Sequence, residues 1–186
     1  NNNTFTYLGK KGDGITVNIA KTVTKINTYL FYSNTNIEKN PKIKEVIFEA
    51  DSQCTAINSY AFYGCTYLTS INIGASITTI GSNAFEKCSA LTSITTPNSL
   101  RTIDESAFTG CKVLASVTLK EGLETINEKA FENCVKLTEI KLPNGLTTIG
   151  TSAFTGCTGL TKVYIPSSVT SMAGFIFSGN TTLTVY

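Results

Sequence analysis

The pair Ala-Phe recurs along this chain at a constant interval. Its copies are Ala61-Phe62, Ala84-Phe85, Ala107-Phe108, Ala130-Phe131 and Ala153-Phe154. A cysteine follows each copy at the same interval: Cys65, Cys88, Cys111, Cys134 and Cys157. A fixed period of this length is the signature of a tandem repeat, in which each unit packs only on its neighbours. The sequence therefore predicts a stacked array rather than a globular domain with a single central core.

The apolar positions inside one unit predict how it folds. Leu68, Ile71 and Ile73 are apolar, and Ile71 and Ile73 flank a polar residue as in a half-buried strand. Proline or glycine follows this strand in most units, and proline cannot donate to a strand ladder. Ile77 and Ile80 then return to the core. The segment Ser82 to Phe85 is predicted to form a single capped helical turn that places the ring of Phe85 in the core.

The array extends upstream of the regular units. Val17, Ile19, Val23 and Ile26 fit the same template, followed by a polar insertion over residues 33–40. We therefore predict one array over residues 15–186, with about seven turns of which the first and last are degenerate. Residues 1–14 fit no unit and are interpreted as an N-terminal cap or linker remnant.

The unit Leu-Thr-x-Ile-x-x-Pro-x-x-Leu-Thr-Thr-Ile-Gly-x-x-Ala-Phe-x-x-Cys, clearest over residues 137–157, resembles the Treponema-type leucine-rich repeat of BspA-like surface proteins. The resemblance implies a right-handed, curved leucine-rich repeat solenoid. Its concave face would carry one parallel β-sheet, and its convex side short strands and single helical turns, with little helix overall. It also implies an extracellular or cell-surface location and adhesion to host matrix or cell-surface proteins.

Outward-facing strand residues are the candidates for binding, because they form the concave face. In the middle units they are serine and threonine, which we interpret as a solvated sheet surface. Toward the C-terminus the face becomes charged and aromatic, which suits protein recognition better. The predicted binding residues are Lys120, Glu139, Lys141, Lys162 and Tyr164. Glu139 and Lys141 are expected to form an ion pair.

The cysteines are predicted to be buried thiols rather than disulfides. All but Cys54 fall at one repeat position, and Cys54 itself occupies a core slot. Side chains stacked at one position point in parallel, which is a poor approach for a disulfide. The predicted structural core ladder comprises Phe62, Phe85, Phe108, Phe131, Phe154, Cys65, Cys88, Cys111, Cys134 and Cys157.

Composition narrows the function classes. The chain contains no histidine, which removes Ser-His and Cys-His nucleophile pairs and most zinc sites. Its 15 basic and 13 acidic residues give a net charge of +2, too small to favour nucleic acid. No apolar run is long enough to insert this fragment in a membrane. We therefore predict no catalytic residue, metal or cofactor. A host protein as the ligand is what the resemblance to BspA-like surface proteins implies.

Three function classes stay open. We favour a surface-displayed or secreted adhesion module. The alternatives are a structural spacer or stalk, and a carbohydrate-active enzyme built on a β-helix, for which Glu139 and Lys141 are the one acid–base pair on the face. Asn2 and Asn180 begin glycosylation sequons.

Overall fold

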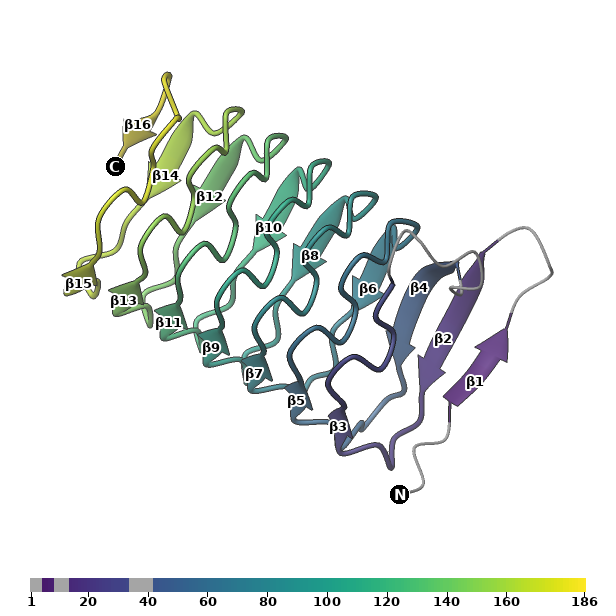
Figure 1. Ribbon diagram of the computed structural model, residues 1–186. Coiled ribbons are helices and arrows are strands. Elements are labelled where there is room, and N and C mark those ends of the chain that lie inside the picture. The colour runs from purple at the N-terminus through teal and green to yellow at the C-terminus, as the bar shows by residue number, and fades with distance from the viewer. Residues whose placement is uncertain (1–4, 9–13, 34–41) are drawn as a thin grey trace.

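The chain winds into a solenoid of similar coils stacked along one axis (Figure 1). The computed structural model describes residues 5–8, 14–33 and 42–186. Each coil places one strand on each of two opposite sides. A short connection and a longer one, which we call the turn side, join these strands into a coil. The predicted parallel solenoid is confirmed. Asn2 and most of the polar insertion lie outside the described residues.

The longer strands form the side that we call the primary sheet. Its strands are β2 (Ile15–Ile19), β4 (Ile43–Phe48), β6 (Ser70–Asn72), β8 (Ser93–Thr95), β10 (Ser116–Thr118), β12 (Glu139–Lys141), β14 (Lys162–Tyr164) and β16 (Thr184–Val185). Their ladders are parallel, and they divide into β2-β4-β6, β8-β10 and β12-β14-β16. In β6, β8, β10 and β12 the middle residue is buried and its two neighbours are exposed.

The opposite side is one continuous parallel sheet of seven two-residue strands, the secondary sheet. They are β3 (Lys25–Ile26), β5 (Ala56–Ile57), β7 (Thr79–Ile80), β9 (Thr102–Ile103), β11 (Thr125–Ile126), β13 (Thr148–Ile149) and β15 (Ser171–Met172). In each strand from β3 to β13 the second residue is buried against the primary sheet.

One strand breaks the parallel pattern. β1 (Phe5–Leu8) runs antiparallel along β2, so β1 rather than β2 is the edge strand at the N-terminal end of the primary sheet. The interpretation of residues 1–14 as a cap or linker stays a prediction, because most of that segment lies outside the described residues.

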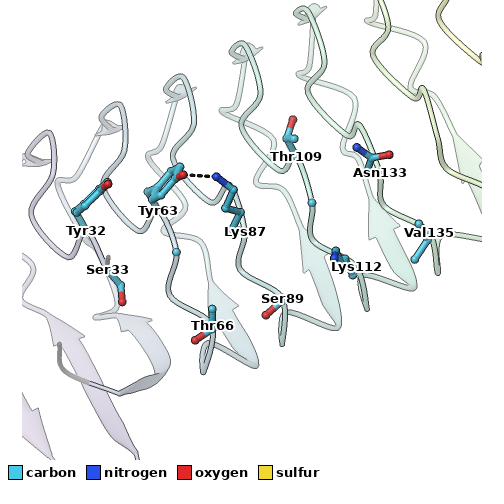
Figure 2. Close-up of a pocket in the computed structure, with 12 residues that line it drawn as sticks. Tyr32, Ser33, Tyr63, Thr66, Lys87, Ser89, Thr109, Lys112, Asn133 and Val135 are labelled. Atoms are coloured by element: carbon cyan, nitrogen blue, oxygen red, sulfur yellow. Dashed lines mark hydrogen bonds between the residues drawn. The ribbon is translucent and has the colours of Figure 1, made fainter. Parts of the chain in front are cut away.

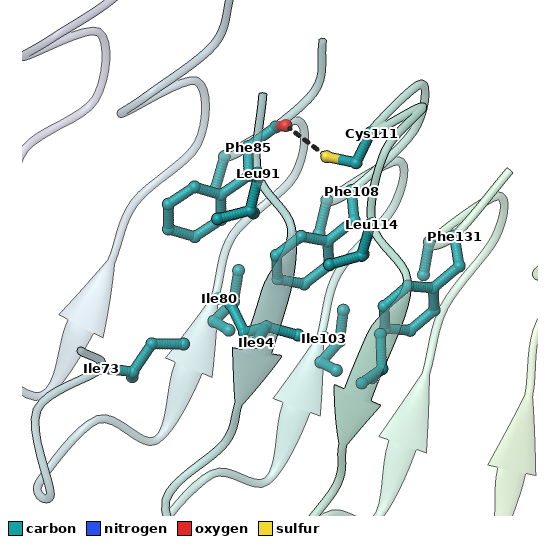
Figure 3. Close-up of a cluster of buried hydrophobic side chains, with 14 of the residues drawn as sticks. Ile73, Ile80, Phe85, Leu91, Ile94, Ile103, Phe108, Cys111, Leu114 and Phe131 are labelled. Carbon is teal, nitrogen blue, oxygen red and sulfur yellow. Dashed lines mark hydrogen bonds between the residues drawn. The ribbon is translucent and has the colours of Figure 1, made fainter. Parts of the chain in front are cut away.

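A column of stacked phenylalanine rings runs through the core (Figure 3). Neighbouring rings are nearly parallel, and their centroids are 5.1 to 5.7 Å apart. The column contains Phe31, Phe62, Phe85, Phe108, Phe131, Phe154 and Phe177. The rings from Phe62 to Phe154 are fully buried, and leucine and isoleucine columns pack beside them. The core is thus a set of like-on-like columns.

All six cysteines are buried and none is paired in a disulfide. Each thiol of the repeat position donates to the phenylalanine carbonyl of the preceding coil, as Cys111 Sγ does to Phe85 at 3.2 Å (Figure 3). The same bond is made by Cys65, Cys88, Cys134 and Cys157. Burial raises the pKa of the Cys65 and Cys111 thiols to about 12, so both stay protonated donors at neutral pH.

Asn180 takes the cysteine position in the last coil. Its Nδ2 donates to the carbonyl of Phe154 at 3.0 Å, so the amide replaces the thiol as donor. The sequon nitrogen is therefore engaged in the fold, which is the opposite of what an exposed glycosylation acceptor requires.

The expected helical turn does not form. Residues 82–87 make hydrogen-bonded turns, and no helix occurs in the described parts of the chain. Asn83 and Lys87 have φ of 60° and 61°, which a right-handed helix excludes. The hydrogen bonds of successive backbone N–H groups explain this conformation. The N–H of Phe85 donates to the carbonyl of Ala107 in the next coil, whereas the N–H of Glu86 donates to the carbonyl of Asn83 within the same turn. The neighbouring coil, rather than a local cap, sets this conformation.

The last coil shifts the register of the repeat by one residue. A strictly constant repeat interval would place Tyr186 opposite Val163, facing inward. The structure instead pairs Val163 with Val185, which is one residue earlier in the sequence than the constant interval predicts. Because side chains alternate along a strand, a shift of one residue moves each of them to the other face. Tyr186 consequently lies on the outer face and is 59% exposed.

Candidate functional site

The predicted binding residues lie together on the C-terminal half of the primary sheet. β12 presents Glu139 and Lys141 outward, on either side of buried Ile140. β14 presents Lys162 and Tyr164 in the same way. Lys120 lies beyond the end of β10, exposed, and its N–H donates to Thr96 Oγ1 at 3.0 Å. The structure therefore brings four of these residues onto adjacent strands and leaves Lys120 at their border.

The charges on this face are arranged across strands rather than along one. The register of β12 and β14 places Glu139 opposite Lys162 and Lys141 opposite Tyr164. The expected ion pair between Glu139 and Lys141 was wrong: within the described residues no nitrogen–oxygen distance of 4 Å or less joins them. Both side chains are exposed, so their charges are available to a partner.

Tyr164 is the aromatic centre of this face, and it is not alone. Its ring stacks on that of Tyr186, with centroids 4.9 Å apart and an interplanar angle of 15°. The register shift at β16 brings the two rings together, and a constant repeat interval does not predict this pair. We call Lys141, Lys162, Tyr164 and Tyr186 the C-terminal face. Tyrosine and lysine together offer an amphipathic surface that is already ordered.

The middle of the primary sheet is different. A groove of about 410 Å³ lies where the ladder divides between β6 and β8, and its lining includes Ser70, Asn72, Ser93 and Thr95. These side chains are short and polar, and they carry no charge. This region fits the interpretation of a solvated strand surface.

A cluster of tyrosines on the turn side was not predicted from the sequence. Tyr29 stacks on Tyr60 and Tyr32 stacks on Tyr63, with centroids 4.9 Å apart in both pairs. Edge and tilted contacts of 5.5 and 5.7 Å link the pairs. We call Tyr29, Tyr32, Tyr60 and Tyr63 the tyrosine cluster; it holds half of the eight tyrosines in the chain. The signal was a repeated Tyr-x-Phe-Tyr, hidden by the insertion between its copies.

A groove of about 800 Å³ runs from this cluster across consecutive coils (Figure 2). We call it the turn-side groove. Its lining residues are Tyr32, Ser33, Tyr63, Gly64, Thr66, Lys87, Ser89, Thr109, Gly110, Lys112, Asn133 and Val135. Lys87 Nζ donates to the hydroxyl of Tyr63 and lies 4.7 Å from that ring's centroid. Lys87 also pairs with Glu86 at 3.1 Å, and these bonds raise its pKa, so it is positively charged.

The described residues show neither a metal-binding cluster nor a reactive thiol. Among them, no three cysteine, aspartate or glutamate side chains gather where they could hold a metal ion. The thiols are buried, and burial raises the pKa of Cys88 well above its ordinary value, as it does for Cys65 and Cys111. A protonated thiol is a poor nucleophile.

A solenoid of stacked parallel coils with an inward-facing leucine at a fixed repeat position defines the leucine-rich repeat class of proteins. Residues 55–184 match, in 6 copies, the family described as BspA type Leucine rich repeat region. The chain belongs to this family. The family and fold are those of non-enzymatic repeat proteins that mediate protein interactions.

Solved structures agree with this assignment. The leucine-rich repeat protein of Treponema pallidum is 28% identical, with a TM-score of 0.75, over 97% of this chain and 78% of that one. A leucine-rich cell surface protein of Faecalibacterium prausnitzii is 22% identical, with a TM-score of 0.53, over 94% of this chain and 54% of that one. The pneumococcal vaccine antigen PcpA is 21% identical, with a TM-score of 0.65, over 94% and 50%.

The chain thus spans about half the length of the last two proteins. No curated protein matches it. No membrane-spanning helix is present in the part of the chain that the structure describes.

Proposed function

We propose that this chain is a surface-displayed or secreted adhesion module that binds a host matrix or cell-surface protein through the C-terminal face. The observation that carries the proposal is the stacked pair Tyr164 and Tyr186 beside Lys141 and Lys162. Tyrosine is one of the residue types that supply most of the binding energy of an interface. The neighbouring lysines can steer an oppositely charged partner toward it. The name of the Faecalibacterium protein, a cell surface protein, supports the location.

A spacer would use the repeats only for length. Such a stalk has no need of a face that differs along its axis, whereas this face changes from serine and threonine at β8 and β10 to lysine and tyrosine at β12 and β14. The enzyme alternative is weaker, because the side chains of Glu139 and Lys141 are both exposed and neither forms an ion pair with another described residue that would tune it.

Binding of the purified chain to a panel of soluble extracellular-matrix proteins, measured by surface plasmon resonance, tests the proposal. For the protein that binds, Tyr164→Ala should weaken the affinity by about 1 to 2 kcal/mol, or about 5- to 30-fold. Lys141→Ala or Lys162→Ala should mainly slow association and reduce its dependence on salt.

Glu105→Ala is the matched control, because Glu105 is exposed on the turn side, away from the C-terminal face. The proposal fails if Glu105→Ala abolishes binding while Tyr164→Ala leaves it intact. A chain that binds no matrix or cell-surface protein at all would favour the spacer.

A further inference from the structure

We propose that the turn-side groove is a second binding site, and that its ligand is a linear anionic polysaccharide. The groove lies away from the C-terminal face, and the protein interaction proposed above does not use it. Its shape, its charge and the state of its backbone groups each point to this ligand.

The shape of the groove favours a linear, repetitive ligand. One wall is formed by the residues just after each core phenylalanine, such as Tyr63 and Asn133. The other wall is formed by the residue after each cysteine, which is Thr66, Ser89 or Lys112 in successive coils. A polymer lying along the solenoid axis therefore meets an equivalent pair of walls at every coil, which a compact ligand would not exploit.

Of two glycines between the walls of the groove, Gly110 leaves open space and Gly64 does not. Gly64 and Gly110 have φ of 70° and 72°, at the position that Lys87 and Asn133 fill in other coils. A Cβ on Gly64 would lie 2.2 Å from the carbonyl oxygen of Ser33, so no side chain fits there. A Cβ on Gly110 would meet nothing closer than 3.8 Å, so the space beside it is open to a ligand.

The charge of the lining favours an anion. It includes the ammonium groups of Lys87 and Lys112 and no carboxylate. Lys87 is partly neutralised by Glu86, whereas Lys112 is exposed and makes no ion pair with any described residue. Because the whole chain has a net charge of only +2, attraction for a polyanion would come from this local arrangement rather than from the protein as a whole.

The backbone favours a sugar polymer over an extended acidic peptide. A peptide added along a groove gains affinity from main-chain hydrogen bonds. Here those donors are already used, because each donates to a backbone carbonyl oxygen of the next coil. The N–H of Gly64 donates to the carbonyl of Glu86, that of Lys87 to the carbonyl of Thr109, and that of Gly110 to the carbonyl of Glu132. Recognition must run through side chains instead. Within the described residues, Ser89, Lys112 and Asn133 have side-chain polar groups that make no hydrogen bond, and hydroxyl and amide groups suit the hydroxyls of a sugar.

Four polymers of matched length test this inference: heparin, polygalacturonate, dextran and poly-L-glutamate, each titrated into the purified chain by microscale thermophoresis at low and high salt. Heparin or polygalacturonate should bind, and neutral dextran should not. Binding of heparin alone would indicate a sulfated ligand, and binding of polygalacturonate alone would indicate a carboxylated one. Binding should weaken as salt rises, since the charges are exposed.

Variants locate the site. Lys112→Gln should weaken binding by about three- to tenfold, since it removes the exposed ammonium. Gly110→Asn should block the groove while keeping the fold, because Asn133 adopts the same backbone conformation one coil away, with φ of 60°. Lys136→Gln and Gly179→Asn are the matched controls, since neither residue lines the groove. Lys141→Gln should also leave polysaccharide binding unchanged, which separates this site from the C-terminal face.

Circular dichroism verifies that each variant is folded. The inference is overturned if only poly-L-glutamate binds, if dextran binds as well as the anionic polymers, or if no polymer binds. It is equally overturned if Lys112→Gln and Gly110→Asn bind as tightly as their controls do.

Discussion

Replacing Phe108 by alanine tests the central claim about this core, that its rings act as a column. Phe108 is fully buried and its ring stacks on two others, those of Phe85 and Phe131, at 5.3 and 5.2 Å. Truncating a buried phenylalanine costs about 3 to 5 kcal/mol, and each stacked pair adds about 0.5 to 1.5 kcal/mol beyond burial. We therefore expect the upper end of the range, about 5 kcal/mol, for Phe108→Ala.

The same substitution at the end of the column should cost much less. Phe177 is half-buried and has one stacked neighbour, Phe154, at 5.7 Å. Phe177→Ala should lower the free energy of unfolding by about 1 to 2 kcal/mol. Phe175→Ala should be nearly neutral, because that ring is 77% exposed and lies outside the column.

Urea unfolding followed by far-ultraviolet circular dichroism measures these differences; the chain has no tryptophan to report by fluorescence. Because Phe108→Ala removes much of a typical domain's stability, Phe108→Leu provides a milder variant, with an expected loss of about 1 to 2 kcal/mol. If Phe108→Ala and Phe177→Ala lowered the free energy of unfolding equally, ring stacking and burial would not determine the loss of stability, and the reasoning would be refuted.

The remaining predictions concern the thiols and one turn. All six cysteines should react with a thiol reagent only after denaturation, and a mass showing any disulfide in native protein would contradict this. Since burial raises the pKa of the Cys65 and Cys111 thiols from 9.0 to about 12, their contribution to stability is complete below pH 9 and is lost as pH rises toward 12; urea midpoints measured across this interval should fall. Cys111→Ser should destabilise by about 1 to 3 kcal/mol in the same assay, because a hydroxyl is more costly to bury than a thiol. Gly122→Ala should destabilise by more than about 2 kcal/mol, since its Cβ would lie 1.8 Å from the carbonyl oxygen of Asn98; a loss no greater than that of an exposed alanine variant would exclude the clash.

The constant repeat interval was sufficient to predict the core of the inner coils, although in the last coil Met172, at the repeat position of buried Ile149, is 50% exposed. Ile140 and Val163, for example, fall at the same repeat position, and both are buried in the middle of a strand. The reason is physical: in a stacked array, a position that is buried in one coil is usually buried in the next coil as well. A residue type that recurs at a fixed interval therefore indicates a buried position.

The turn side could not be predicted in the same way. Ser82 to Phe85 looks like a helical start because serine and asparagine favour helix caps. The observed conformation depends on carbonyl groups of the next coil, such as that of Ala107, which accepts from the N–H of Phe85. Local residue preferences contain no information about a partner that lies almost a full repeat away.

The aromatic surfaces were missed where the interval itself changes. Tyr29 and Tyr60 stack although they lie further apart in the sequence than one regular repeat, and Tyr164 and Tyr186 stack although they lie closer than one. The deletion before Val185 shifts the register of β16, and so changes which side chains of that strand face outward. Sequence analysis at a fixed interval therefore finds the core of such an array and overlooks its special surfaces.

The hydrogen bonds that join the coils give the array a particular response to mechanical force. They link each coil to the next, as from Phe85 to Ala107, and so run along the solenoid axis. A pull on the two ends would load the bonds of one boundary at a time, so coils would peel off in sequence. Of the described coils, the one that contains the exposed side chains of Met172 and Phe175 would open first. Each released coil would lengthen the chain by about 75 Å.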